Sequence, residues 1–276
     1  MAEPTWLYTV FAGLFGLLLG SFLNVCIYRF PRDLSVVMPR SFCPECEKPI
    51  AAYDNIPVLS YLLLGRKCRN CAAVIPWRYP TVELLTGAAF FFAVYKYGVT
   101  PIALKLAIFA AMQIALIFTD LEARILPDEF TLGGTLVGIL LAVFVPMPPS
   151  ILSLFYSNSW NPRVLSVAEA VLGACFTSTM IWGFAKFWGH IRKREMLGFG
   201  DVKMVAMIGA FFGLQGTMLA LVFGCILGIV IGGGYMLIAR KKASEYELPL
   251  GTFLALASLV LALAGAPVLT WYSNLG

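Results

Sequence analysis

Three aspartates stand at the ends of apolar runs, where an ionised carboxylate is costly unless it has a task. Asp120 closes one run in FTDLEARILPDEFT, Asp128 precedes the next run, and Asp201 opens a third in MLGFGDVK. Two carboxylates from different helices that meet at one depth can share a proton, and such a pair can activate water and protonate a leaving amine. The placement therefore predicts acid–base chemistry at one end of a helix bundle.

Two other interpretations of these acids are open. Asp120 and Asp128 could cap helix ends, and Asp201 could be a first-turn acid that the helix dipole favours. Acids within a membrane also line ion and proton pathways in transporters. Against a transporter, the three acids lie at one face rather than near the midplane, and no inverted repeat is visible in the sequence. A membrane transporter or a scaffold with structural acids is thus the alternative to an enzyme.

Apolar helices must position these acids. Of the 276 residues, 60% are hydrophobic and 13% are charged, whereas soluble domains have about a quarter charged. Because only helices and closed barrels satisfy the backbone in lipid, apolar runs near 18 residues predict spanning helices. We therefore expect an all-α polytopic membrane protein with about eight transmembrane helices. The runs lie near residues 6–28, 82–98, 101–119, 130–147, 165–189, 201–216, 217–239 and 250–272.

Two of these runs need comment. The first has no basic head and no small-residue cleavage site, so we expect a retained span rather than a cleaved signal peptide. The sixth and seventh are divided only by residues 213–216, which we interpret as a tight turn because two of these four residues are glycines.

Lys and Arg predict the orientation of the spans. The loop after the first run is rich in both, and later loops on the same side contain Arg124 and residues 192–194 and 240–242, whereas the opposite side offers Lys96, Lys105 and Arg163. By the positive-inside rule, both termini lie outside and the three aspartates face the cytosol. The net charge of +5 reflects this topology, with some attraction to anionic lipid, and it needs no nucleic-acid partner.

The polar segment at residues 29–80 contains four cysteines, Cys43 and Cys46 in CPEC and Cys68 and Cys71 in CRNC. Two C-x-x-C pairs are typical of a structural zinc site with four thiolates. Two disulfides or a redox dithiol are the competing interpretations, but cytosolic thiols stay reduced. Four thiolates leave no open coordination position, so this zinc would organise the loop. We therefore expect a first transmembrane helix at 1–28, a cytosolic zinc-binding domain at 29–80 and a helical core at 81–276.

Seven ordered motifs resemble the type IV prepilin peptidases, also called prepilin leader peptidase and N-methyltransferase. Two small departures from the family pattern are Thr252 in LPLGTFL, where the family usually has a proline, and a longer stretch from Pro146 to Arg163. We expect neither to touch the chemistry. The motifs are GSFLNVCIYRFP from Gly20, RSFCPECEKPI from Arg40, YDNIPVLSYL from Tyr53, CRNC from Cys68, IPWRYPTVELLTG from Ile75, DLEARILPDEFT from Asp120 and GFGDVK from Gly198.

The resemblance implies a G-x-G-D aspartyl protease whose catalytic pair is Asp120 and Asp201. Gly198, Gly200, Lys203 and Asp128 would support the pair, and Lys203 could act on it electrostatically or merely snorkel. The implied substrates are type IV prepilins and the pseudopilins of type II secretion. Their short basic leader would be removed at the cytosolic face of the bacterial inner membrane.

The resemblance also implies a second activity, because family members commonly methylate the new N-terminus from S-adenosylmethionine. The zinc loop and the following YPTVELLTG are associated with that activity. The sequence has no glycine-rich methyltransferase fingerprint of the soluble kind. Glu83 is a candidate for the donor site, since its carboxylate could bind an amine or simply cap its helix. His190, the single histidine, is expected to be a surface residue at a helix end.

Overall fold

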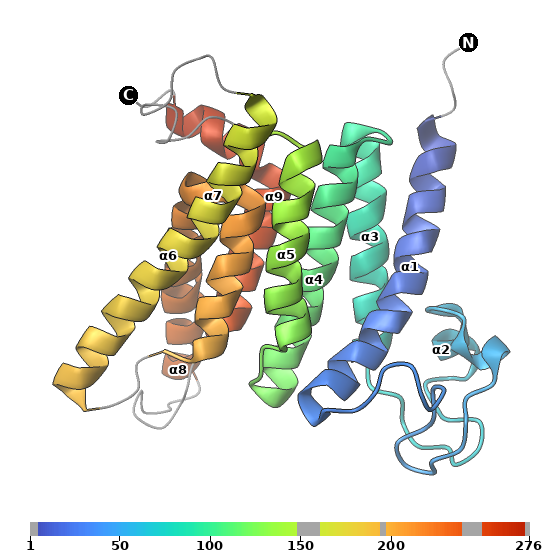
Figure 1. The fold of residues 1–276 in the computed structure, drawn as a ribbon. Coiled ribbons are helices and arrows are strands. Elements are labelled where there is room, and N and C mark those ends of the chain that lie inside the picture. Colours follow the sequence, from blue (N-terminus) through green and yellow to red (C-terminus); the bar gives the residue numbers. More distant parts are fainter. Residues whose placement is uncertain (1–4, 148–160, 194–196, 239–249, 274–276) are drawn as a thin grey trace. The chain divides into compact units, whose positions relative to one another are not determined.

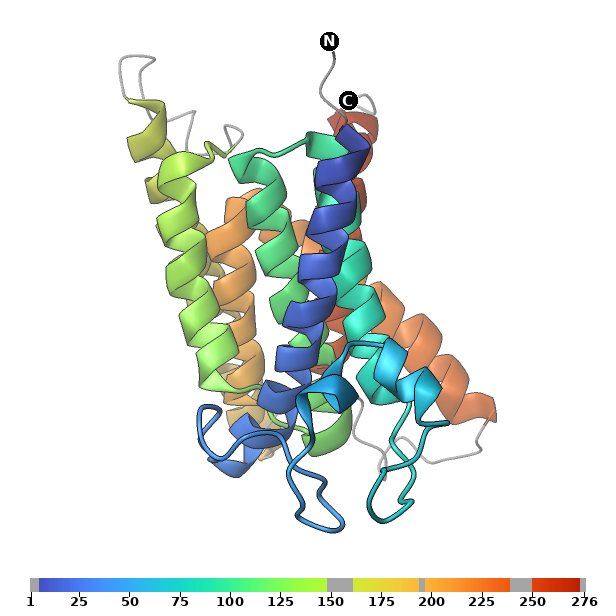
Figure 2. The same ribbon diagram turned by 90° about the vertical axis from the view of Figure 1, so that its right-hand side faces the viewer.

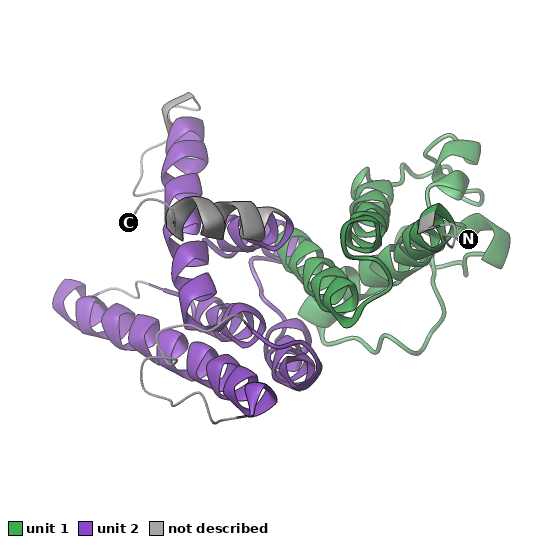
Figure 3. Cartoon of the chain, turned by 90° about the horizontal axis from the view of Figure 1, so that it is seen from above, with its two compact units in different colours: residues 1–119 green, residues 120–276 purple. Residues whose placement is uncertain are grey.

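The computed structural model describes residues 5–147, 161–193, 197–238 and 250–273. Within these ranges ordered structure is helical, and strand-like pairing is limited to two isolated bridges, Phe42 with Pro49 and Lys67 with Val74. The expected all-α class is therefore confirmed. The chain forms two compact units, residues 1–119 and residues 120–276, which Figure 3 shows in different colours.

Four helical stretches in the described residues are long and apolar enough to cross a membrane, which confirms a polytopic membrane protein. They are Trp6–Arg32, Pro101–Ala123, Pro162–Arg192 and Phe199–Met236. Each of the eight apolar runs falls on a helical segment (Figure 1). The helices that carry them are α1 (Thr5–Arg29), α3 (Arg78–Tyr97), α4 (Pro101–Ala123), α5 (Asp128–Phe144), α6 (Pro162–Arg192), α7 (Phe199–Leu227) with its continuation, and α9 (Leu250–Ser273).

The helix labelled α7 contains a turn at Gly213, whose φ of 68° and ψ of −172° are not helical. Val205 and Leu221 line one cavity, although a straight helix would separate them by about 24 Å. The chain therefore turns back at Gly213 and continues through a π-helical segment, Gly228–Gly232, into α8 (Gly233–Ile238), as the orange segments of Figure 1 show. The boundary expected at residues 213–216 is thus confirmed.

In unit 1, α1 packs closely along α3 (Figure 2). A Cβ atom built on Gly16 would lie 2.7 Å from the carbonyl oxygen of Thr86, and one built on Gly20 would lie 2.7 Å from the Cα atom of Glu83. Neither position has room for a side chain, so the glycines allow the two backbones to touch. The buried Asn24 then donates from Nδ2 to the carbonyl oxygen of Tyr79, 3.0 Å away, which joins α1 to the first turn of α3.

In unit 2, the first half of α7 is the central element and packs against α5, α6 and α9. A Cβ atom on Gly173 of α6 would lie 2.7 Å from the carbonyl oxygen of Gly209, so α6 and α7 are also in backbone contact. This half of α7 supplies most of the fully buried large side chains of unit 2, namely Met204, Val205, Met207, Ile208 and Phe211. A rigid, buried helix therefore carries Asp201 in its first turn.

Two sequence expectations lie outside the described residues. Most of the stretch from Pro146 to Arg163 belongs to residues 148–160, and the basic residues Arg194 and 240–242 belong to the ranges 194–196 and 239–249.

Candidate active site and metal centre

Asp120 and Asp201 meet beside Gly251 in unit 2. Asp120 lies near the end of α4 with 7% of its surface exposed, Asp201 lies in the first turn of α7, and Gly251 lies in the first turn of α9. A Cβ atom built on Gly251 would be 3.2 Å from Oδ2 of Asp120 and 3.2 Å from Oδ1 of Asp201. The two oxygens are therefore no more than about 6.4 Å apart, twice that distance. Two ionised carboxylates within this distance repel each other, which disfavours ionisation of both at once.

Thr252 is a partner of Asp120 that the sequence did not indicate. Its backbone amide and its hydroxyl both donate to Oδ2 of Asp120, at 2.8 and 2.7 Å. The expectation that the departure at Thr252 leaves the proposed chemistry untouched is therefore wrong. A proline at this position could make neither hydrogen bond, because it has no N–H and no hydroxyl. The available signal was a hydroxyl residue next to a glycine in an otherwise apolar first turn.

The glycines of GFGD differ in how much they are needed. Gly198 is the N-cap residue of α7, and a Cβ atom there would lie 3.4 Å from Oδ2 of Asp201, an ordinary contact. A Cβ atom on Gly200 would lie 3.2 Å from Cβ of Leu126, which is tighter than most such contacts. Gly200 thus lets the loop after α4 approach the first turn of α7. The requirement for glycine is sharper at Gly200 and Gly251 than at Gly198.

Lys203 and Asp128 form an ion pair. The ammonium of Lys203 lies 2.6 and 2.8 Å from the two carboxylate oxygens of Asp128, and it also lies 5.1 Å from the ring centroid of Phe199. Asp128 begins α5, so the pair ties the start of α5 to the start of α7. The carboxylate of Asp128 is more than half exposed, and such pairs contribute about 0 to 1 kcal/mol. Its contribution is therefore alignment of two helix ends more than stability.

The four cysteines of CPEC and CRNC converge in unit 1. Their sulfur atoms all lie within 4.8 Å of one another, and Sγ of Cys43 is 3.8 Å from Sγ of Cys71. A tetrahedron with Zn–S bonds of about 2.3 Å has edges of about 3.8 Å. The cluster can therefore hold a metal ion, and its dimensions fit zinc with four thiolates.

The two cysteine loops have the same backbone hydrogen bonds. Cys43 donates to the carbonyl of Lys48 and accepts from the amide of Glu47; Cys68 donates to Ala73 and accepts from Ala72. Each loop also has one residue with positive φ at the same place, Glu47 at 56° and Ala72 at 57°. The segment is thus built from two matching loops. The sequences of the two loops, CPECEKPI and CRNCAAVI, share only the cysteines and the final isoleucine, so their likeness is one of backbone conformation.

Backbone amides prepare one of these sulfurs for a metal. The amides of Cys71 and Asn70 donate to the sulfur of Cys68, which lowers the pKa of this thiol to about 7. The thiolate is the form that binds a metal, so these amides favour the ligand form at Cys68, whereas burial and the neighbouring thiols raise the pKa of Cys71 to about 12.

Comparisons with known proteins identify the family of this chain. The family model of the bacterial peptidase A24 N-terminal domain matches residues 14–97, and that of the type IV leader peptidase family matches residues 107–233. A protein of Aeromonas salmonicida named prepilin leader peptidase/N-methyltransferase is 33% identical, over 97% of this chain and 94% of its own length. The chain belongs to the type IV leader peptidase family.

Two other relatives carry the same name as the protein of Aeromonas salmonicida. The protein of Myxococcus xanthus is 37% identical over 86% of this chain and 65% of its own length. The protein of Pseudomonas aeruginosa is 30% identical over 94% of this chain and 91% of its own length. No solved structure matches the chain significantly.

The cysteine cluster and the aspartate pair fall in the ranges of different family models. The four cysteines lie in the first matched range, and Asp120 and Asp201 lie in the second. Gly251 and Thr252 lie beyond both ranges, so only the folded chain places them beside the acids.

Glu83 holds a turn of the polar segment. Its side chain is buried, with 7% of the residue exposed, and it accepts a 2.7 Å hydrogen bond from the amide of Val58. Val58 has a φ of 60° and a ψ of −46°, unusual for a β-branched residue, and it precedes α2 (Leu59–Leu63). The carboxylate therefore stabilises a strained turn, which favours a structural role over a donor site.

Arg29 anchors the same polar segment, and the sequence did not single it out. It is 3% exposed, and its guanidinium donates to the carbonyl oxygens of Ser35 and Pro39, each at 2.7 Å. A buried cation that donates to loop carbonyls fixes the path of the chain toward Cys43.

Proposed function

We propose that the chain removes the short basic leader from type IV prepilins and type II secretion pseudopilins and N-methylates the new N-terminus. Family membership supports this proposal, as do relatives named for both activities. The observation that carries the peptidase half is the meeting of Asp120 and Asp201 beside Gly251. A transporter or scaffold is not favoured, because neither function explains the family.

The proposed reaction uses the two carboxyl groups as one unit that holds one proton. The ionised carboxylate takes a proton from a water molecule, whose oxygen attacks the scissile carbonyl carbon, while the protonated carboxyl supports the developing charge on the carbonyl oxygen. A proton then passes to the leaving nitrogen as the C–N bond breaks. The products are a carboxylic acid on the leader, which loses its proton to solvent or to the amine, and a new amine on the pilin, and the pair again holds one proton.

Thr252 and Gly251 give this pair its geometry. Thr252 directs two donors at Oδ2 of Asp120, which fixes the orientation of this carboxyl group beside Asp201. Gly251 presents only backbone between the two carboxylates. An extended substrate strand can approach both acids across a residue that has no side chain.

We propose that the four cysteines bind a structural zinc ion, through Cys43, Cys46, Cys68 and Cys71. The fit of the 3.8 Å sulfur separation to a tetrahedron supports zinc, and four protein ligands leave no position for water. The ion would stabilise the polar segment and take no part in peptide cleavage.

We further propose S-adenosylmethionine as the methyl donor, which would supply its methyl group to the new N-terminal amine. Glu83 stays a candidate for this step, and its carboxylate is buried and accepts a hydrogen bond from the amide of Val58.

The proposed setting is the bacterial inner membrane, with the acids and the cysteine cluster at the cytosolic face. Basic residues support this orientation in unit 2. Arg124 is the first residue after α4, the helix that carries Asp120, and Arg192 ends α6 shortly before Asp201. A prepilin whose basic leader stays in the cytosol would present its cleavage junction at that face.

Cleavage of a prepilin-type substrate by purified protein in detergent tests the proposal. The parent should cut at the leader junction, and Asp120→Asn and Asp201→Asn should not, although each should elute and melt like the parent. Equal cutting by all three proteins would reject the catalytic pair. Mass spectrometry of the product with S-adenosylmethionine present tests the second activity, since a product without an added methyl group would reject it for this chain.

A further inference from the structure

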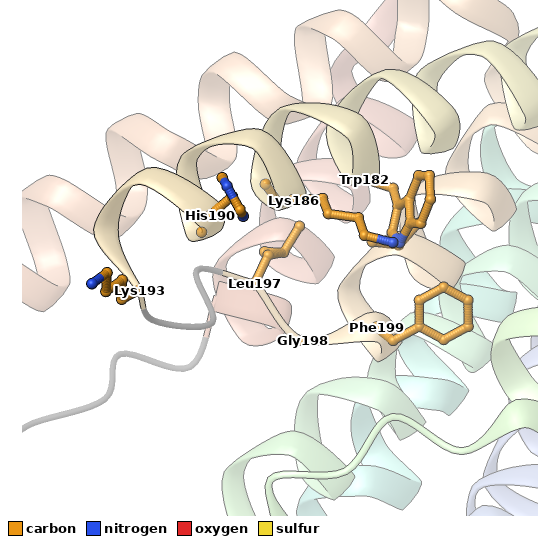
Figure 4. Close-up of a pocket in the computed structure, with 10 residues that line it drawn as sticks. Trp182, Lys186, His190, Lys193, Leu197, Gly198 and Phe199 are labelled. Atoms are coloured by element: carbon orange, nitrogen blue, oxygen red, sulfur yellow. The ribbon is translucent and has the colours of Figure 1, made fainter.

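A basic cavity lies between the last turns of α6 and the start of α7 (Figure 4). It has a volume of about 550 Å³ and is lined on the α6 side by Trp182, Lys186, His190 and Lys193, which lie on successive turns of one helix face. Gly198 and Phe199 form part of the opposite wall. None of the described residues that line it is acidic.

The helix dipole does not account for this arrangement. Cations favoured by the carboxyl end of a helix lie within its last turn, whereas Lys186 stands well before the end of α6 at Arg192. The ammonium of Lys186 lies 4.6 Å from the ring centroid of Trp182, which fixes the charge at the cavity wall (Figure 4). Lys186 extends toward Trp182 and Lys193 lies at the other end of this helix face, so the basic side chains border the cavity along its length and favour an anionic occupant (Figure 4).

A second cavity adjoins the first and has opposite chemistry. Its volume is about 280 Å³, its lining is almost wholly apolar, and it shares Ala185 and Leu197 with the basic cavity. One turn of a helix with side chains occupies on the order of 400 Å³ or more, so a peptide helix does not fit. A flexible hydrocarbon chain is narrower than a helix and can enter this cavity. The other lining residues include Ile181, Phe184, Trp188, Val205, Leu221 and Leu254.

We propose that the two cavities together bind one anionic phospholipid of the surrounding membrane. The phosphate would lie among Lys186, His190 and Lys193, and an acyl chain would enter the apolar cavity past Ala185 and Leu197. Basic pockets between spanning helices are a recurrent way to hold such headgroups. A free phosphate would use only the basic half, and the shared wall with the apolar half is what favours a lipid.

The basic cavity borders the start of α7, the helix that carries Asp201. Gly198 and Phe199 line the basic cavity and directly precede Gly200 and Asp201. A bound headgroup would therefore contact the N-terminus of the helix that carries Asp201. Binding itself does not depend on the proposed peptidase reaction, so it can be measured without an activity assay.

Native mass spectrometry of the full chain in detergent, with phosphatidylglycerol or phosphatidylcholine added, tests the proposal. The parent should retain phosphatidylglycerol in preference to phosphatidylcholine. A Lys186→Gln/Lys193→Gln variant should bind phosphatidylglycerol roughly 30-fold more weakly, since each basic residue near an anionic lipid contributes about fivefold. The control Lys96→Gln/Arg163→Gln removes the same charge from other helix ends and should bind like the parent. Equal binding by the parent and the Lys186/Lys193 variant would overturn the site.

Two further arms separate the lipid from a free anion. Inorganic phosphate should not displace phosphatidylglycerol; displacement at millimolar concentration would show that the site takes the phosphate alone. Ala185→Phe, which narrows the shared wall, should weaken binding of phosphatidylglycerol if the variant elutes as a folded protein. Unchanged lipid binding in a folded Ala185→Phe protein would reject the acyl-chain seat, and Ala185→Leu provides the same test should Phe prevent folding.

Discussion

The amide and the hydroxyl of Thr252 both donate to a single oxygen of Asp120, at 2.8 and 2.7 Å. Two donors on one oxygen fix the rotation of the carboxyl group, and this is the same oxygen that lies beside Gly251 and Asp201. The start of α9 therefore belongs to the proposed active site as much as α4 and α7 do. Thr252 is a positioning residue in this arrangement, since it acts through Asp120.

Removing the hydroxyl of Thr252 should slow cleavage. Thr252→Val keeps the amide and the shape of the side chain but loses one hydrogen bond to a carboxylate, worth about 1.5 to 3 kcal/mol, or roughly 10- to 150-fold in kcat. Thr252→Ser restores the hydroxyl and should recover most of the rate. Steady-state kinetics on a prepilin-type peptide, with KM, the pH–rate profile and melting temperature measured alongside, distinguish this role. A Val variant with the parent's kcat and pH profile would remove Thr252 from the mechanism.

The two aspartates should be non-additive. Because one proton is shared by the pair, Asp120→Asn and Asp201→Asn should each remove nearly all cleavage, and the double variant should be no worse than either alone. Single-turnover rates measure this directly. The pH profile of the parent should show apparent pKa values that belong to the pair and not to either residue. Losses that multiply in the double variant, or a rate independent of pH from acid to neutral, would mean that the acids act separately.

The fold was predictable where composition and backbone chemistry leave few choices. Long apolar runs must be helical in lipid, so the helices and the break at Gly213 followed from the sequence. The two C-x-x-C pairs predicted convergence of four sulfurs, because a local loop brings each pair together. Such features depend on residues that are close in the chain.

The contacts of the active site depend on distant segments, and there the sequence was a poorer guide. Thr252 meets Asp120 across 132 residues, and Glu83 meets Val58 across 25. Neither pairing has a spacing rule. A threonine in an apolar helix usually bonds to its own backbone, as Thr86 does with Val82, so its type alone does not indicate an active-site contact.

The cysteine cluster should bind one zinc ion, and loss of a ligand should release it. Cys68→Ser should lower zinc content measured by elemental analysis, because three thiolates cannot complete the tetrahedron. Cys175→Ser, an exposed cysteine outside the cluster, is the matched control and should keep the parent's zinc content. Zinc competes with protons for thiolates, so its retention against a chelator should fall as pH is lowered. Parent-like zinc content in Cys68→Ser would refute a four-thiolate site.

Zinc loss should affect the polar segment and not peptide cleavage by the pair. The cysteines lie in unit 1, and the acids lie in unit 2. Limited proteolysis of Cys68→Ser should therefore show faster cutting within residues 29–80, with cleavage of a prepilin-type substrate within about threefold of the parent. Equal protease resistance in the two proteins would show that the ion does not hold the segment together.

The glycine beside the carboxylates should be more critical than the first glycine of GFGD. In Gly251→Ala the new methyl group would lie 3.2 Å from oxygens of both Asp120 and Asp201 and 3.1 Å from Leu126, where it displaces water and the substrate strand. A misplacement of about 1 Å at a catalytic site can cost about 100-fold in rate, so cleavage should fall roughly 10- to 100-fold. Gly198→Ala places its methyl group 3.4 Å from Asp201, an ordinary contact at a φ of −67° that alanine adopts readily. Its cleavage rate should stay within about threefold of the parent's, and equal losses in the two variants would show that Gly251 has no special place between the acids.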